Sequence, residues 1–337
     1  MATKNKVAKR NPPKVSRMKP LVSVVVLNWN GKRFVDPFLN AYYQTVYPSN
    51  RLELVFIDNN STDESVAYAK KKVRKSWKTV FVQNDNNYGY AGGNNKGIPH
   101  TSGDYILIVN NDLELAPQLI SELVSTAQKT DADAVVPKLM FKNKPGYINN
   151  AGSILESDQA WPVRERGYDQ KDEGQFDKTE EVTAVCGACV LFKRSFLQDV
   201  GLFDAKFFMY FEDSDLSWRG QRAGKLFYYE PKAVAYHVHT GSSKEGSPLF
   251  NFYVGRNRVL IMAKNAQLKL FFKVLGNTLY WHLVFRIWSL LKSAITRNGR
   301  KHAVVEFWRS QKMLWSLFSQ LPRAFAKRWH IIKEETL

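Results

Sequence analysis

Cysteine is scarce in this chain of 337 residues, which contains only Cys186 and Cys189. Two cysteines cannot build a disulfide framework for a chain of this length, and such usage is typical of a reducing compartment such as the cytoplasm. The C-x-x-C spacing by itself would indicate redox or zinc chemistry. Because the pair lies within an apolar run and no second pair accompanies it, we interpret both as small packing residues.

Long hydrophobic runs are missing as well. The longest uncharged stretch of the Trp-rich C-terminal segment, residues 274–285, is too short for the roughly 20 residues that a membrane-spanning helix needs. Residues 1–20 have no apolar core of a secretory signal, because their Lys and Arg residues run into Pro12, Pro13 and Pro20. We expect this segment to be a disordered basic tail.

Acidic residues are absent from residues 1–20, which hold seven Lys or Arg, and are few in residues 264–337, where fourteen basic residues stand against three acidic ones. Residues 21–263 are neutral, with 28 residues of each sign, although the net charge of the chain is +18. A nucleic-acid-binding protein would carry a basic stripe on its folded body. The distribution therefore argues against nucleic acid as a partner, in spite of the sequence pI of 9.7.

Short apolar runs alternate with helix-like segments from residue 21 onward. This alternation predicts an α/β fold with a mostly parallel sheet and helices on both faces. The predicted strands are residues 21–28, 52–58, 79–84, 104–110 and 132–139, and the predicted helices are 33–46, 62–76, 91–99 and 117–130, with Thr62 as a helix cap. Ligands of such sheets bind beyond the carboxyl ends of the strands. Those ends are the polar sequences NWNG, DNNSTD, NDNNYGYAGGNN and NNDLEL.

The pattern changes after about residue 140. Residues 181–193 predict one strand, 195–201 a short helix, 213–224 a longer helix, and 226–230 and 233–239 two more strands. Only helical patterns follow residue 248. We expect three parts: the basic tail 1–20, an α/β domain over 21–265 and a basic amphipathic helical region over 266–337.

Asp112 ends the polar turn after the fourth predicted strand, a position where a diphosphate-bound cation would sit. Mg²⁺ and Mn²⁺ prefer oxygen ligands and use few protein carboxylates. An ordinary strand-end turn explains the same residues, since Asn and Asp favour turns. His237 and His239 alternate on one strand and so point to one face. His237 is therefore a candidate metal ligand, although a strand histidine is more often structural.

Asp58 closes the second predicted strand, where an acid can accept hydrogen bonds from a base or a ribose; helix capping is the competing interpretation. The run after it holds Gly89, Gly92 and Gly93, which permit close backbone approach to a ligand. Neither G-x-G-x-x-G nor G-x-x-x-x-G-K-[ST] occurs there, which disfavours a dehydrogenase or a P-loop enzyme.

Three acids, Glu212, Asp213 and Asp215, stand among Phe207, Phe208, Met209, Tyr210 and Trp218. A carboxyl group in apolar surroundings can have a raised pKa, which suits a general base. Acids at a helix start, stabilised by the helix dipole, are an equally good interpretation of the pattern.

The ordered set VSVVVLNWNG, FIDNNSTDES, NNYGYAGGNN, YILIVNND, GACVLFKR, FFMYFEDSDLSWR and AYHVHTGSS resembles the family-2 glycosyltransferases, nearest the rhamnosyltransferase-like bacterial branch, over about residues 22–265. The resemblance implies the GT-A fold, inversion at the anomeric centre and a divalent cation, Mn²⁺ or Mg²⁺. It also implies transfer of a sugar from a nucleotide-sugar to a hydroxyl of a glycan or lipid-linked acceptor in cell-surface polysaccharide synthesis. dTDP-rhamnose is the first expected donor, and UDP-hexose or UDP-galactofuranose the next.

The resemblance also implies roles for particular residues. Asp112 matches the last acid of the family's D-x-D motif, whose first acid is Asn110 here, so that the cation meets one charge fewer. Asp213 matches the general base, and His237 and Ser242 match the late histidine and the serine after it. The remaining nucleotide-sugar residues are Asn28, Asn30, Asp58, Asn87, Gly89, Gly93, Asn94 and Asn111. The acceptor and sugar pocket comprises Gly187, Ala188, Glu212, Asp215 and Trp218.

Two alternatives share this fold. A catalytically silent nucleotide-sugar-binding protein would keep the pocket without the chemistry, although Asp112 and Asp213 argue against it. A processive membrane polymerase would need spanning helices and a Q-x-x-R-W motif, and the sequence has neither.

Residues 266–337 include one helix pattern that places Lys269, Lys273 and Asn277 on one side and the apolar residues Leu268, Phe271, Phe272 and Leu275 on the other. Such a helix can lie in a membrane interface with its cations near anionic headgroups. Packing on the body or a homodimer is the competing interpretation. We expect a cytoplasmic protein, peripheral on the inner face of the cell membrane.

Overall fold

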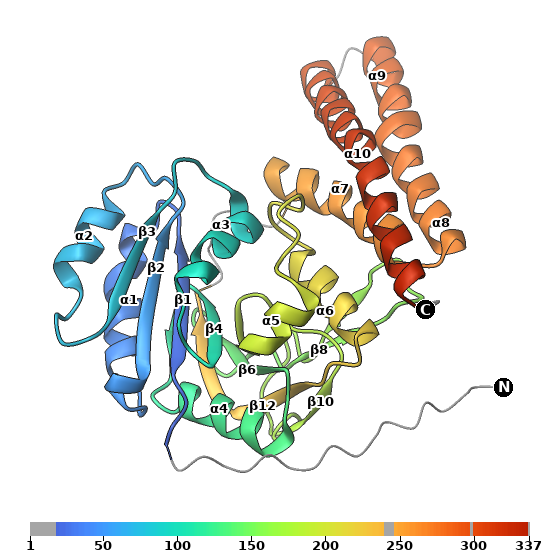
Figure 1. Ribbon diagram of the computed structural model, residues 1–337. Coiled ribbons are helices and arrows are strands. Elements are labelled where there is room, and N and C mark those ends of the chain that lie inside the picture. The colour runs from blue at the N-terminus through green and yellow to red at the C-terminus, as the bar shows by residue number, and fades with distance from the viewer. Residues whose placement is uncertain (1–17, 239–245, 297–298, 336–337) are drawn as a thin grey trace.

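The computed structural model describes residues 18–238, 246–296 and 299–335, with side chains described to residue 328. Its body is a curled sheet covered by helices, from which a helical hairpin projects (Figure 1). The parallel strands at one side of the sheet are β1 (Val22–Asn28), β2 (Leu52–Asp58), β3 (Thr79–Gln83) and β4 (Tyr105–Asn110). β1 pairs in parallel with both β2 and β4, and β3 pairs with β2. The carboxyl ends of these strands therefore meet at one edge, as the sequence predicts.

The other half of the sheet mixes parallel and antiparallel pairs. β11 (Cys189–Lys193) is antiparallel to β4 and to β6 (Ala134–Phe141), and β12 (Phe227–His237) is parallel to β6. The sheet order is β10-β12-β6-β11-β4-β1-β2-β3. The short strands are β5 (Leu113–Leu115), β7 (Ile148–Asn150), β10 (Glu180–Val182) and the separate pair β8 (Ser153–Leu155) and β9 (Val163–Glu165).

Helices cover both faces of the sheet, because successive residues of a buried strand point to opposite sides. Val24 of β1 packs in one core with residues of α1 and α4, and Val25 packs in the other with residues of α3, α5 and α6. The body helices are α1 (Lys32–Tyr43), α2 (Ser65–Lys72), α3 (Gly89–Gly97), α4 (Leu119–Thr130), α5 (Arg194–Val200) and α6 (Glu212–Arg222), with short 3₁₀ turns at Ser49–Arg51 and Ile98–His100. The predicted α/β class is confirmed.

Three local predictions were wrong. The predicted strand 181–193 is interrupted between β10 and β11, because the backbone of Gly187 turns to donate a hydrogen bond to Asp213. Residues 226–239 do not form two strands, since β12 runs through to His237 with an irregularity between Glu230 and Val234. Thr62 does not cap a helix. α2 begins at Ser65, whose backbone N–H donates a hydrogen bond to the Asp63 side chain.

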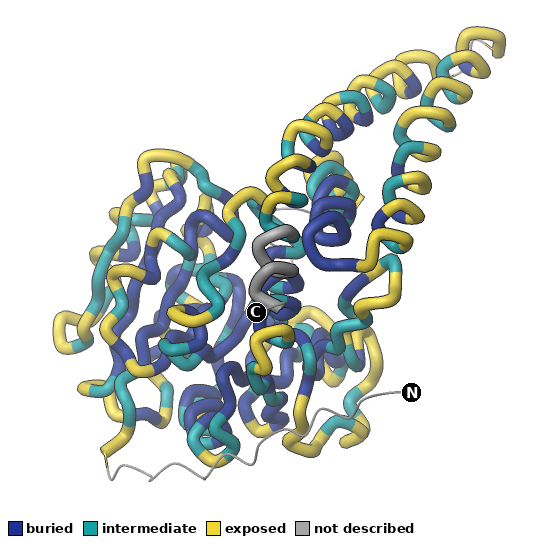
Figure 2. Tube along the Cα trace, turned by 45° about the vertical axis from the view of Figure 1, so that its right-hand side comes forward, coloured by how far each residue is buried: buried dark blue, intermediate teal, exposed yellow. Residues whose placement is uncertain are grey.

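Four α-helices and one π-helical turn follow the body in the described part of the chain. α7 (Pro248–Asn265) packs on it, and α8 (Leu268–Leu279), a π-helical turn (Tyr280–Val284) and α9 (Phe285–Thr296) continue as one arm of the hairpin. The other arm is α10 (Arg300–Glu335), which packs against α7 and α9. In Figure 2 the strands of the body are largely buried, whereas exposed residues recur along both arms. In the described part of the chain, no helix is both long and apolar enough to cross a membrane.

Candidate active site

A cavity of about 630 Å³ opens beyond the carboxyl ends of β1 and β4, in the place that the strand pattern predicts. Most of the predicted site residues line it: Asn30, Asn87, Gly89, Asn110, Asn111, Asp112, Gly187, Ala188, Glu212, Asp213 and His237. The predicted residues outside its lining are Asn28, Asp58, Gly93, Asn94, Asp215 and Trp218. His239 and Ser242 lie outside the described residues.

Asn28 ties the strand ends together below the cavity. Its amide nitrogen donates to Asp58 Oδ1 at 3.2 Å and to Ser65 Oγ at 2.7 Å, and its amide oxygen accepts from Asn111 at 3.0 Å. Asp58 accepts a second hydrogen bond from the backbone N–H of Ser61 at 2.9 Å. Asn28 and Asp58 are both buried, so they support the lining instead of facing the cavity.

The glycine-rich run supplies close packing around the same end of the sheet. Gly89 has φ of +69°, and a Cβ there would lie 2.3 Å from the carbonyl oxygen of Phe208. A Cβ on Gly93 would lie 2.7 Å from Leu27, so this glycine allows α3 to approach β1. Asn94 is buried on α3 and donates to the carbonyl of Tyr90 at 2.9 Å. Gly93 and Asn94 thus act behind the cavity wall.

Asn59 and Tyr90 line the cavity and were not among the predicted residues. The Asn59 amide nitrogen donates to Asn87 Oδ1 and to the carbonyl of Gly89, both at 3.0 Å. The Tyr90 hydroxyl donates to the carbonyl of Gly187. Burial, together with the neighbouring carboxyls, raises the pKa of Tyr90 well above its usual range. Both residues stand inside the polar motifs that follow β2 and β3, which was the available signal.

Asp112 and His237 face each other at the cavity, with His237 Nε2 3.3 Å from Asp112 Oδ1. The other ring nitrogen, Nδ1, lies 2.9 Å from Asn149 Oδ1 on β7, which can only accept a hydrogen bond. With Nδ1 as the donor in this contact, Nε2 and the Asp112 carboxylate oxygen face each other, and a cation between them would bind to both.

The donor set of this pair fits a divalent cation. The carboxylate oxygen suits Mn²⁺ or Mg²⁺, and the imidazole nitrogen favours Mn²⁺ over the harder Mg²⁺. The Asn149 contact orients the ring as outer partners of metal-bound histidines do. Within the described residues, no group of three or more His, Cys, Asp and Glu side chains could hold a metal ion. A cation here would take its remaining ligands from phosphate oxygens and water.

Asp213, in the first turn of α6, is held by hydrogen bonds on both carboxylate oxygens. Oδ2 accepts from the backbone N–H of Gly187 at 2.9 Å, and Oδ1 accepts from the backbone N–H of Ser214 at 2.7 Å. Burial raises the pKa of Asp213, although these hydrogen bonds oppose the increase. The result is a fixed carboxylate with increased proton affinity that faces the cavity.

Glu212 precedes Asp213 and also lines the cavity. Glu212 is buried, and no hydrogen-bond partner for its Oε2 is found in the described part of the chain. Burial, followed by the charge of Asp213, raises the pKa of Glu212 well above its ordinary value. Burial and the neighbouring charge therefore both favour the protonated form of Glu212.

The loop before α6 is strained, because Phe208, Tyr210 and Phe211 all have φ between +67° and +70°. Asn257 of α7 secures it through hydrogen bonds from Nδ2 to the carbonyls of Phe207, Met209 and Tyr210 at 2.8–2.9 Å. Phe208 also stacks on Tyr253 of α7, with ring centroids 4.9 Å apart. Nothing in the apolar pattern of α7 indicated this role for Asn257.

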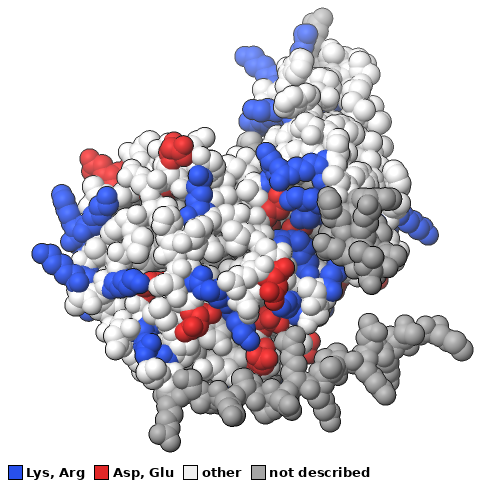
Figure 3. Space-filling model, in the orientation of Figure 1, with Lys and Arg blue, Asp and Glu red and all other residues white. Residues whose placement is uncertain are grey.

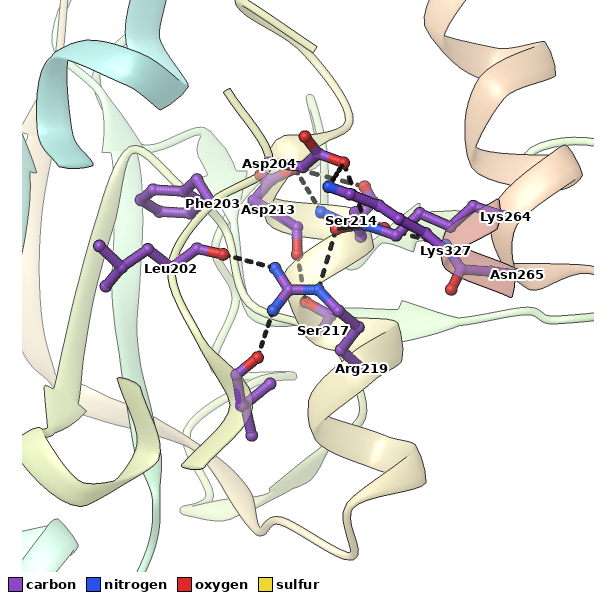
Figure 4. Close-up of polar contacts among 12 residues, drawn as sticks. Leu202, Phe203, Asp204, Asp213, Ser214, Ser217, Arg219, Lys264, Asn265 and Lys327 are labelled. Carbon is purple, nitrogen blue, oxygen red and sulfur yellow. Dashed lines mark hydrogen bonds and ion pairs between the residues drawn. The ribbon is translucent and has the colours of Figure 1, made fainter. Parts of the chain in front are cut away.

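Asp215 and Trp218 point away from the cavity, unlike the prediction. Asp215 is fully buried and contacts Lys264 at 2.7 Å and Arg219 at 3.0 Å, two residues that Figure 4 labels. Burial alone would raise the pKa of Asp215, but Lys264 and Arg219 outweigh it and hold the pKa below its usual value. Trp218 is buried in the apolar cluster formed with α7 and α10. Asp204 extends the network through ion pairs to Lys264 of α7 and Lys327 of α10. Because Lys264 also pairs with Asp215, the network links α6 to α7 and α10.

The lining also includes Trp29, Arg33, Phe34, Leu249 and Tyr253. Among the described lining residues, Arg33 supplies the basic side chain. Its guanidinium lies 4.6 Å from the Phe34 ring centroid. The lining thus combines one cationic side chain and three acidic ones with the six aromatic side chains of Trp29, Phe34, Tyr90, Phe208, Tyr210 and Tyr253.

The family model described as "Glycosyl transferase family 2" matches residues 23–201. The low-salt glycan biosynthesis hexosyltransferase Agl10 of Haloferax volcanii is 24% identical over 205 residues, which cover 60% of this chain and 62% of that protein. The matched segment therefore spans less than two thirds of that relative. An N-acetylglucosaminyl-diphospho-decaprenol L-rhamnosyltransferase of Mycobacterium tuberculosis is 22% identical over 306 residues, covering 84% of this chain and 97% of that protein.

A solved structure shares the architecture. The mannosyltransferase PcManGT from Pyrobaculum calidifontis, solved with GDP-Man and Mn²⁺, superimposes with a TM-score of 0.54 at 18% identity, covering 94% of this chain and 86% of that one. At this identity the likeness shows a shared fold.

Proposed function

Because the chain belongs to glycosyl transferase family 2 and has the GT-A fold, we propose that its cavity binds a nucleotide-sugar and that the protein transfers the sugar to a hydroxyl group of an acceptor. One observation carries this proposal: the Asp112–His237 pair and the carboxylate of Asp213 line the same cavity at the carboxyl ends of the strands. The first can hold a cation for a diphosphate, and the second can accept a proton.

The donor would lie against the strand ends. The amides of Asn59 and Asn87 and the side chains of Trp29 and Asn30 offer polar and stacking contacts to a nucleoside. Asp112 and His237 would hold Mn²⁺ or Mg²⁺, which when bound neutralises charge on the leaving diphosphate. Arg33 adds a second positive group at the cavity wall.

Asp213 would act as the general base. In a single displacement, the acceptor oxygen forms its bond to the anomeric carbon while the bond from that carbon to the diphosphate oxygen breaks, and the hydroxyl proton passes to Asp213. The hydrogen bonds from Gly187 and Ser214 fix the direction of the carboxylate. Its raised pKa moves its proton affinity towards that needed near neutral pH.

The other carboxyls support inversion at the anomeric centre as part of this proposal. A retaining enzyme with a glycosyl-enzyme intermediate needs a second, ionised nucleophile. Burial raises the pKa of Glu212 and so favours its protonated form, and Asp112 faces His237. Asp213 is therefore the one carboxylate of the described lining that is suited to the acceptor side.

The relatives indicate the substrate classes. The mycobacterial relative is named for rhamnosyl transfer to a diphospho-decaprenol-linked sugar, and the archaeal relative for glycan biosynthesis. We therefore propose a glycan or lipid-linked acceptor in cell-surface polysaccharide synthesis, with dTDP-rhamnose as first donor and UDP-hexose or UDP-galactofuranose as the next.

A donor screen tests the proposal. Nucleotide release would be measured for dTDP-rhamnose, UDP-glucose, UDP-galactose and UDP-galactofuranose with Mn²⁺ or Mg²⁺, with and without diphospho-polyprenol-linked N-acetylglucosamine, and products would be identified by mass spectrometry. We expect acceptor-dependent release from one donor, and its loss in Asp213→Asn. Donor binding without release from any of them, in wild type as in the variant, would instead identify a silent nucleotide-sugar-binding protein.

A further inference from the structure

The distal half of the hairpin, residues 278–296 and 299–310, exposes large apolar side chains on both arms. On one arm Val284 is 54% exposed, Trp288 52%, Leu291 60% and Ile295 83%. Their spacing of four, three and four residues places them on one helix face. On α10, Val305 is 46% exposed and Trp308 65%. An apolar surface of this extent on a soluble body marks an interaction site.

The side of the distal hairpin that faces inward is small and polar. Its buried residues, among those described, are Thr278, Ser293, Ala303 and Ser310. Two contacts join the arms through polar groups: His282 Nδ1 lies 3.1 Å from Ser310 Oγ, and Arg286 lies 3.1 Å from Glu306. The distal half therefore buries small and polar side chains between the helices, and large apolar side chains are among those on its outside.

The proximal half has the opposite arrangement. Phe271 and Val274 of α8 and Leu317 of α10 are buried together with α7 residues in a third apolar cluster. The apolar face that the sequence suggested for membrane contact therefore packs partly inside the protein: Phe271 is buried and Leu275 packs against the cluster, while Leu268 and Phe272 remain exposed. Burial of apolar groups away from water explains the arrangement of the proximal half. It does not explain the exposed apolar side chains of the distal half.

We propose that the distal hairpin inserts its apolar exterior into the headgroup and acyl boundary of an anionic lipid bilayer. In lipid, apolar side chains face outward at no cost, and small and polar residues bring helices together. Trp side chains favour this interface, because their rings are apolar and their N–H groups find polar partners there. The depth is that of an interfacial helix, about 5–10 Å.

The positive charge of the hairpin favours a bilayer over a second copy of the chain as the partner of this surface. Lys292, Arg300, Lys301 and Lys312 are exposed on the hairpin, and its acid among the described side chains, Glu306, is paired with Arg286 and Arg309. The charged side chains visible on the projecting part in Figure 3 are Lys and Arg. Two such surfaces would repel each other, whereas lipid phosphates attract them.

This surface also has a defined relation to the cavity. The hairpin packs on α7, and α7 contributes Leu249 and Tyr253 to the cavity wall. In Figure 1 the hairpin projects from the side of the body where α7 lies. A bilayer bound by the hairpin would thus lie on the side of the molecule that carries this wall.

Vesicle flotation with the full-length protein tests the inference, which does not depend on the proposed function. Vesicles of pure phosphatidylcholine would be compared with vesicles containing phosphatidylglycerol. Leu291→Ser/Ile295→Ser removes apolar contact, and Val46→Ser, 61% exposed on the body, is its control. Lys292→Gln/Lys301→Gln removes charge, with the exposed body residues in Lys71→Gln/Lys129→Gln as control. Thermal unfolding would confirm that all variants fold.

We expect binding to anionic vesicles that falls at least tenfold in the apolar variant. Each removed cation should lower partitioning roughly fivefold, equivalent to about 1 kcal/mol. Both controls should bind as wild type does, and the free protein should sediment as a monomer. Absence of binding, equal binding by variants and controls, or equal binding to both vesicle types would overturn the proposal. A dimer in lipid-free buffer that Leu291→Ser/Ile295→Ser dissociates would assign the surface to a second copy instead. Transfer to a short soluble acceptor reports separately on the active site.

Discussion

The amide nitrogen of Asn257 lies 2.9 Å from the carbonyl oxygen of Tyr210. Tyr210 has φ of +68° and stands two residues before Glu212, the first residue of α6. A buried side chain of α7 thus holds the strained loop from which α6, with Asp213, begins. The loop, α6 and α7 all lie beyond residue 201, where the family match ends, so the position of Asp213 depends on contacts outside the matched segment.

Asn257→Ala should therefore reduce turnover more than donor binding. Removing three hydrogen bonds from a buried loop costs about 1–3 kcal/mol of stability, and the released loop no longer fixes Asp213. We expect kcat to fall at least tenfold with a smaller change in the donor KM, measured by steady-state nucleotide release. Asn251→Ala, at an exposed position of the same helix, should change neither. A rise in KM at unchanged kcat would show that Asn257 acts on donor binding.

Asp213→Asn should abolish transfer and leave donor affinity nearly unchanged, because the base acts on the acceptor proton. Loss of a general base costs about 10²- to 10⁴-fold in rate. Transfer rates and calorimetric titration of the donor measure the two effects separately. Asp158→Asn, an exposed position, is the matched control. Retention of more than about a tenth of the wild-type rate would exclude Asp213 as the base and direct attention to Glu212.

Removal of the divalent cation should stop turnover. We expect an excess of chelator to abolish nucleotide release and added Mn²⁺ to restore it. Asp112→Ala should weaken donor binding measured with Mn²⁺ present, and His237→Ala should weaken it less, because the carboxylate carries the formal charge. Full activity in chelator would contradict the metal role and identify Arg33 as the counterion of the diphosphate.

Glu212 should make the protein less stable as the pH rises above about 4.5, the ordinary range for glutamate. Its pKa is raised in the folded state, so between the unfolded and folded pKa values the folded state binds more protons, and the free energy of unfolding falls with increasing pH. Below the unfolded pKa this effect vanishes. Glu212→Gln should remove the decline and increase stability at pH 7.5 relative to wild type.

Urea unfolding at pH 5 and pH 7.5 measures this difference. Glu173→Gln, at an exposed glutamate, should keep the wild-type dependence on pH. An unchanged decline in Glu212→Gln would show that another group causes it.

The sequence was most informative where local chemistry repeats along the chain. The apolar runs that became β1, β2 and β4 end in polar residues, and parallel strands bring such ends together whatever the details of packing. Asn111 and Asp112 could therefore be expected at this edge of the sheet, whereas the assignment of Asp213 and Gly187 to the same pocket depended on the family resemblance. Asn59 and Tyr90 belonged to the same motifs and could have been found by extending that argument by one residue.

Neighbours in the sequence were less informative. Asp213 and Asp215 are two positions apart on α6, which separates them by about 200° around a helix. One therefore faces the cavity and the other the buried Lys264, although both belong to one acidic motif. Their assignment depends on the rotation of the helix about its axis, which the packing of α6 against α7 determines.

The amino-acid sequence by itself determined the α/β class, the edge of the sheet that carries the polar motifs and the confinement of excess positive charge to the two ends of the chain. These follow from local periodicity and composition, which act before any distant contact forms. Only the tertiary structure decided that Asn257 supports the loop before Asp213, that Asn149 orients His237, and that Trp288 and Ile295 face outward while Ser293 faces inward. Each of these depends on the partner against which a helix or strand comes to rest, and the energy of burial is shared among residues far apart in the chain.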